Sequence, residues 1–261
     1  MSSRRSEQER AVSATCLVVF AAFLLAMMLW NTIWYTIPTR YTLHAEFLER
    51  ANAPHVMGMF LAYLVISAVG FVGVLGLVQT YGSGVGLIAD VVRLSGLAFF
   101  VTNYWLWAAV FVVQHRITLL TDRPSNPPEW LLQVFDASSS LWALPSWGAI
   151  TPSILFYLGC AWLLLRSSRL LPRIAAAVFA LLAVSQLLVL VYAGLRGLQF
   201  YNLGGFTFAY INDLLYTGGQ VVGYLFAGAA MLTERGIFSR TAMSRTASRG
   251  GTRIGPPTGR E

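Results

Sequence analysis

The chain has 261 residues, of which 56% are hydrophobic and 11% are charged. Soluble domains carry roughly 25% charged residues, so this composition excludes an ordinary water-soluble fold. The net charge of +7 rests on arginine, because the sequence contains no lysine. Arginine-only usage with abundant alanine, glycine and valine is typical of a GC-rich bacterial genome. Basic residues beside a membrane are expected from insertion alone and do not indicate a nucleic-acid partner.

Six apolar segments are long enough to cross a hydrocarbon core of about 30 Å as helices of about 20 residues. In chain order, their expected limits are 12–34, 56–78, 94–113, 148–165, 174–195 and 214–232. The runs are continuous and do not alternate as barrel strands do. The sequence therefore predicts an all-α fold, a polytopic bundle of six transmembrane helices over residues 12–232. The first run is too long for a cleaved signal peptide, and we expect it to be retained as an anchor after a tail of residues 1–11.

The distribution of arginine predicts the orientation. With the N-terminus inside, five of the 18 arginines fall in outer segments and the other 13 fall inside. The outer set is Arg40, Arg50, Arg116, Arg123 and Arg196. Because arginine is enriched on the cytoplasmic side, this asymmetry favours both termini in the cytoplasm. The sequence thus predicts a multi-pass protein of a bacterial inner membrane, with the lipid bilayer as its first partner.

The longest connection, residues 114–146, joins the third and fourth spans on the expected outer side. Asn126, Pro127 and Glu129 have the pattern of a helix start, with a cap, a proline in the first turn and a glutamate that reaches back. The sequence predicts a short interfacial helix over about 127–136, which either covers the bundle as a lid or contributes to a ligand site. Residues 141–147 are expected to form either a re-entrant segment or the start of the fourth span.

The C-terminal segment 233–261 is rich in Arg, Ser, Thr and Gly, and it lacks an apolar pattern. We expect it to be a disordered cytoplasmic tail. Its arginines are interpreted either as charges that set topology or as groups that adhere to anionic lipid.

Few polar side chains fall inside the predicted spans, and each is a candidate for function because such groups are costly in hydrocarbon. Asn103, Gln186 and Gln220 lie in the third, fifth and sixth spans. They serve either as hydrogen-bonding groups between helices, worth roughly 0.6 to 2 kcal/mol each, or as the lining of a solute path. Both interpretations stay open.

Asn212 and Asp213 come just before the sixth span, after an aromatic run. If the helix begins near 206, Asp213 lies about 10 Å deep and is a candidate ion or solute site. If it begins near 214, Asp213 is a cap at the membrane interface.

Two further patterns indicate packing. Asp90 and Arg93, spaced i,i+3 where the third helix is expected to begin, are predicted to pair, as a structural anchor or for proton or substrate handling. Small residues form a stripe on the sixth span and another on the second, where they let helix backbones approach closely. The stripes consist of Gly219, Gly223 and Ala227, and of Gly70, Gly73 and Gly76. Contact within one chain, with a second copy or with a partner membrane protein is left open.

Reactive motifs are missing from the sequence. It has no CxxC, no HExxH and no Cys/His ligand spacing, and Cys16 and Cys160 both lie in apolar runs. The glycines at 82, 84 and 86 lack the spacing and the lysine of a phosphate-binding loop, and they predict a flexible turn. No catalytic or metal site is predicted, and the sequence names no cofactor.

Residues 156–173, FYLGCAWLLLRSSRLLPR, are followed at once by another apolar helix. They resemble the turn between the fourth and fifth helices of a family of uncharacterised bacterial six-helix membrane proteins. The similarity covers Arg166-Ser167-Ser168-Arg169, Leu171 and Pro172-Arg173, and it extends to the number of helices. It implies a six-helix fold and carries no activity or catalytic residues. The long outer loop and the arginine-rich tail depart from that family.

Three functional classes are compatible with these observations. A non-catalytic accessory, scaffold or sensor subunit agrees with the scarcity of reactive groups and with the packing stripes. A transporter or channel for a small or lipophilic solute requires Asp213, Asn103, Gln186 or Gln220 to converge on a cavity. An intramembrane enzyme requires a reactive cluster, which the sequence does not contain.

Overall fold

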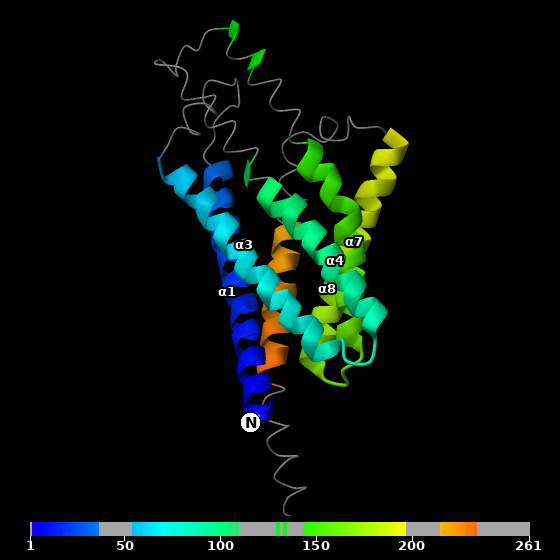
Figure 1. The fold of residues 1–261 in the computed structure, drawn as a ribbon. Helices are drawn as coiled ribbons and strands as arrows, with labels where there is room; N and C mark the ends of the chain where they lie inside the picture. The colour runs from blue at the N-terminus through cyan, green and yellow to red at the C-terminus, as the bar shows by residue number, and fades with distance from the viewer. Residues whose placement is uncertain are drawn as a thin grey trace, which may run out of the picture.

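The computed structural model describes residues 2–36, 54–106, 143–196 and 215–233, with short pieces at 108–109, 129–130 and 133–134. All regular structure in these ranges is helical, which confirms the all-α class (Figure 1). The elements are α1 (Ser2–Thr36), α3 (Pro54–Tyr81), α4 (Gly86–Phe100), the π-helix η1 (Val101–Leu106), α7 (Ala143–Leu165) and α8 (Leu170–Arg196). Residues 215–233 form a further helix.

Five helical stretches in the described ranges are long and apolar enough to cross a membrane. They are Ser6–Leu29, Leu61–Tyr81, Gly86–Leu106, Gly148–Leu165 and Leu170–Val191. The chain is therefore a multi-span membrane protein in contact with a lipid bilayer. The described helix 215–233, which overlaps the predicted sixth span 214–232, is not among the five. It carries Gln220 and several glycines, which lower its hydropathy.

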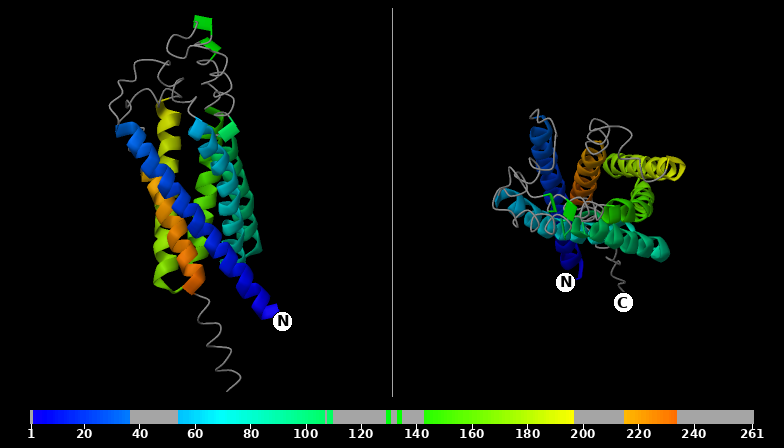
Figure 2. Two further views of the ribbon diagram at one scale, coloured as in Figure 1. Left: turned by 90° about the vertical axis from the view of Figure 1, so that its left-hand side faces the viewer. Right: turned by 90° about the horizontal axis from the view of Figure 1, so that it is seen from above.

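The helices form a ring in which sequence neighbours pack side by side. Contacts join α1 to α3, α3 to α4, α4 to α7 and α7 to α8. The 215–233 helix, orange in the figures, packs against α8 on one side and α1 on the other (Figure 2). The start of α1, the 82–85 turn, the 166–169 turn and the end of the 215–233 helix all lie at one end of the bundle (Figure 1).

The predicted start of the third span at residue 94 is wrong, because α4 begins at Gly86. In the structure the side chains of Asp90 and Arg93 are partly exposed at the end of the bundle and pair with each other. Helix α4 then passes into η1, whose last residue is Leu106.

Residues 143–147 are the first turns of α7 and not a separate re-entrant segment. The helix continues through Pro152, which lacks an N–H group and cannot donate to the carbonyl of Gly148. Of the predicted interfacial helix 127–136, the structure describes only residues 129–130 and 133–134, which are helical, with Trp130 and Val134 exposed. The tail after Thr233 lies outside the described residues.

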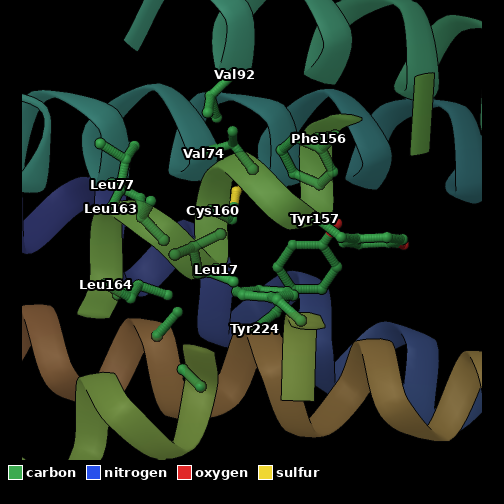
Figure 3. Close-up of a cluster of buried hydrophobic side chains, with 14 of the residues drawn as sticks. Leu17, Val74, Leu77, Val92, Phe156, Tyr157, Cys160, Leu163, Leu164 and Tyr224 are labelled. Atoms are coloured by element: carbon green, nitrogen blue, oxygen red, sulfur yellow. The ribbon is translucent and has the colours of Figure 1, made fainter. Parts of the chain in front are cut away.

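The core of the bundle is aromatic. Phe20, Phe99, Phe100, Phe156 and Phe179 are fully buried. Phe20 lies 5.5 Å from Phe100 between ring centroids, and Phe99 stacks on Phe156 at 5.5 Å. Aliphatic side chains from α1, α3, α4 and α7 pack near the thiol of Cys160 in the same core (Figure 3). Helices that share a close-packed centre of this kind hold one fixed arrangement.

Candidate functional site: a buried tyrosine–glutamine chain

A chain of hydrogen bonds crosses the centre of the bundle. The hydroxyl of Tyr104 donates to Gln220 Oε1 at 3.1 Å, and Gln220 Nε2 donates to the hydroxyl of Tyr157 at 2.8 Å. The Tyr157 hydroxyl in turn donates to that of Tyr216 at 3.3 Å. Three segments are joined in this way: η1, α7 and the 215–233 helix. Gln220, Tyr104 and Tyr157 are all buried, so water does not compete for the two bonds of Gln220, whereas the bond between Tyr157 and Tyr216 is partly buried.

Tyr104 reaches the chain from the π-helix η1. A π-helix has wider turns than an α-helix, and it is frequently found at functional sites. Within this segment the hydroxyl of Thr102 donates to the carbonyl of Ala98 at 2.8 Å. The next residue after Tyr104 is also engaged, because Trp105 Nε1 donates to Ser67 Oγ of α3 at 3.0 Å. The π-helix thus brings two consecutive side chains into contacts with different helices.

Aromatic rings enclose the polar chain. Tyr104 lies edge-on to Phe20, with 5.5 Å between centroids, and Tyr157 stacks on Phe179 at 5.8 Å. The ring of Tyr224 packs against Phe20 at 5.2 Å and Phe179 at 5.6 Å. Its hydroxyl is buried beside Tyr157 but makes no hydrogen bond of normal geometry with a described residue. The centre of the bundle therefore combines dense apolar packing with a short polar path.

Of the three predicted mid-span amides, Gln220 alone lies in this chain. Asn103 belongs to η1 and is half-buried next to Tyr104. Gln186 lies on α8 and is buried, but no hydrogen bond between described residues links it to Gln220. Asn212 and Asp213 lie outside the described residues, so the choice between a cap and a buried site stays a prediction. Asn103 and Gln220 therefore both lie at Tyr104, whereas Gln186 is not linked to them.

Asp90 and Arg93 form an ion pair, with Arg93 Nη1 donating to Asp90 Oδ1 at 2.8 Å. Both side chains are about half exposed, at 61% and 44% respectively. They lie in the first turns of α4, whereas Tyr104 lies in η1, which follows the other end of that helix. This position suits a surface pair and does not bring either group to the buried chain.

The small residues on α3 pack within the chain, against α1. A Cβ atom added at Gly73 would lie 2.7 Å from Leu17, and one at Gly76 would fall on the side chain of Ser13. A Cβ atom at Gly70 would fall on the ring of Phe20. These distances are shorter than normal carbon contacts.

The glycines of the 215–233 helix pack against α8 in the same manner. An added Cβ atom would lie 2.7 Å from Leu182 at Gly219 and 2.7 Å from Phe179 at Gly223. Ala227, on the same helix, is fully buried. Both stripes therefore serve contacts inside one chain.

The four tyrosines were not identified as site residues from the sequence. Tyrosine is common at membrane interfaces, so a tyrosine within a span gives no signal of its own. The useful signal was the mid-span Gln220, because an amide in hydrocarbon requires both a donor and an acceptor. Its partners are 116 and 63 positions away along the chain. Only tertiary structure shows which residues they are.

The chain of hydroxyls and one amide offers no group that is ionised at neutral pH, and no group of three or more His, Cys, Asp or Glu residues lies together in the described ranges. Comparison of the sequence and structure with protein-family models, curated proteins and solved structures finds no match. The chemistry of the arrangement is therefore that of neutral hydrogen bonding between helices.

Proposed function

We propose that the chain is a non-catalytic membrane subunit, with an accessory, scaffold or sensor role in a bacterial inner membrane. We further propose that it crosses the membrane six times with both termini in the cytoplasm. One observation carries the functional proposal. The mid-span amide best placed to bind a solute, Gln220, already has its oxygen and its nitrogen bonded to buried tyrosine hydroxyls. An amide satisfied in this way holds helices together.

The surrounding packing supports the same role. The rings of Phe20, Phe99, Phe179 and Tyr224 fill the space around the polar chain, and the glycine stripes bring neighbouring helices close together. A transporter has to open such a centre during each cycle, which would break these contacts. A scaffold needs the centre only to remain closed.

The test replaces the whole polar chain by apolar groups of similar shape. The variant is Tyr104→Phe, Tyr157→Phe and Gln220→Leu together. Removing both partners of a hydrogen bond is much less costly than removing one. We expect the variant to accumulate in membranes and to restore the phenotype of a deletion strain, because a scaffold requires shape and not the polar atoms.

Gly223→Leu is the control, because it forces a side chain against Phe179. It should lose both the folded protein and the phenotype, which shows that the assay responds to the fold. A triple variant that is folded and abundant yet fails to complement would refute the scaffold role and favour transport.

A further inference from the structure

Three arginines lie in the turn between α7 and α8 or in the first turn of α8: Arg166, Arg169 and Arg173. Arg166 Nη1 donates to the carbonyls of Tyr81 at 3.3 Å and Ser83 at 3.1 Å, so it closes the C-terminal end of α3. Its guanidinium also lies 5.6 Å from the ring centroid of Trp162. Arg173 Nε donates to the carbonyl of Ser167 at 3.3 Å. The backbone N–H of Arg169 donates to Ser167 Oγ at 3.4 Å. These contacts hold the guanidinium groups of Arg166 and Arg173 without neutralising them, whereas for Arg169 it is the backbone that is held.

No carboxylate in the described part of the chain pairs with Arg166, Arg169 or Arg173. Arg93 differs, because Asp90 neutralises it at the same end of the bundle. At this end of the bundle, one described arginine has a carboxylate partner, and the three arginines near the α7–α8 turn have none within the described ranges.

Exposed apolar side chains flank the three arginines. Leu170 is 72% exposed and Leu165 57%, and Trp162 is 41% exposed. Such side chains at the end of a transmembrane helix face the acyl chains and the glycerol region of a bilayer, where indole rings also prefer to lie. This surface therefore places cationic guanidinium groups next to exposed leucine and tryptophan side chains.

We propose that this turn, Trp162 to Arg173, binds the headgroup of an anionic phospholipid. These guanidinium groups pair with no carboxylate in the described ranges, and they carry the charge and the N–H geometry that recognise a phosphate. The exposed leucines and Trp162 favour a lipid over a free anion, because a soluble phosphate makes no use of apolar contacts. The bound lipid links the α7–α8 turn to the 82–85 turn through Arg166.

The test is native mass spectrometry of the full chain in a zwitterionic detergent, titrated with phosphatidylglycerol. One arginine near a lipid surface contributes about fivefold in affinity. Arg169→Gln should weaken binding about fivefold, and Arg169→Gln with Arg173→Gln roughly 25-fold. Arg166 is left intact because it also supports the fold. Arg169→Lys with Arg173→Lys should lie between wild type and the double glutamine variant, because charge is kept and the planar N–H geometry is lost.

Arg93→Gln is the matched control, since it removes one arginine at the same end but from a compensated pair. It should leave the affinity within about twofold of wild type. If Arg93→Gln and Arg169→Gln weaken lipid binding equally, the affinity depends only on the total charge at this end of the bundle, and the proposed site is wrong. Competition by inorganic phosphate at the same concentration as the lipid would overturn the assignment to lipid. Melting temperatures in the detergent alone verify that the variants are folded.

Discussion

Gln220 is the residue on which the centre of the bundle depends, because it supplies both an acceptor and a donor to tyrosines on other helices. Changing it alone leaves the hydroxyl of Tyr104 buried without its acceptor. The hydroxyl of Tyr157 loses a donor at the same time. A buried polar group without its partner costs about 1 to 3 kcal/mol.

We therefore expect Gln220→Leu to lower the stability of the protein more than the triple variant that also carries Tyr104→Phe and Tyr157→Phe. The reason is that the two phenylalanines remove the hydroxyls that Gln220→Leu leaves without a partner, so they recover part of the lost stability. Melting temperatures of purified protein, compared in one detergent, measure the difference. If the decreases in melting temperature simply add, so that the triple variant is the least stable, these hydrogen bonds are not coupled.

A second expectation at this scale concerns two glycines of the same helix, α3. A Cβ atom at Gly76 would fall on the side chain of Ser13 in α1, whereas nothing lies within 4 Å of one at Gly58. Gly76→Ala should lower the melting temperature, because α1 and α3 must separate to make room. Gly58→Ala should be neutral or slightly stabilising, since alanine favours the helix by about 1 kcal/mol over glycine. Equal behaviour of the two variants would mean that the contact between α1 and α3 is loose.

At the scale of single helices, the start of α4 shows how a short polar pair affects a span. Asp90 and Arg93 lie on one face and are about half exposed. Surface ion pairs of this kind contribute about 0 to 1 kcal/mol. We expect Arg93→Gln to change the melting temperature only slightly and to leave the protein's abundance in the membrane unaltered. A loss of folded protein would indicate that Arg93 compensates charge that lies deeper in the bundle.

The helices that could be predicted from sequence are those with uninterrupted apolar runs. The predicted limits of the second span differ from α3 by two residues at its start and three at its end. Helix α4 begins at Gly86, eight residues before the predicted start of the third span, and Gly86–Leu106 as a whole is apolar enough to be a span although it contains Asp90 and Arg93. The π-helix η1 has no signature in the residues 101–106. Tyr104 and Trp105 of this element hydrogen-bond to residues 116 and 38 positions away, which the sequence alone does not reveal.

At the scale of the molecule, the proposed orientation follows from the distribution of arginine. The 82–85 turn and the 166–169 turn lie at the same end of the bundle as the start of α1 (Figure 1). In a background with Cys16→Ala and Cys160→Ala, single cysteines at Ser83 and Ser168 should react with a membrane-impermeant reagent only after the cells are opened. A cysteine at Trp130 should react in intact cells. Labelling of Ser83→Cys from outside would reverse the orientation.

The closed ring also has a consequence for the order of biosynthesis. The 215–233 helix is the last described helix to leave the ribosome, yet it lies between α1 and α8 and carries Gln220. Until it inserts, Tyr104 and Tyr157 have no amide partner, and the first helix lacks a neighbour on one side. We therefore expect maturation to depend on the 215–233 helix, because the earlier described helices complete their contacts only when it arrives. A chain stopped before residue 215 should be recognised by membrane proteases as incomplete, and separate synthesis of the missing helix in the same cell should extend its lifetime.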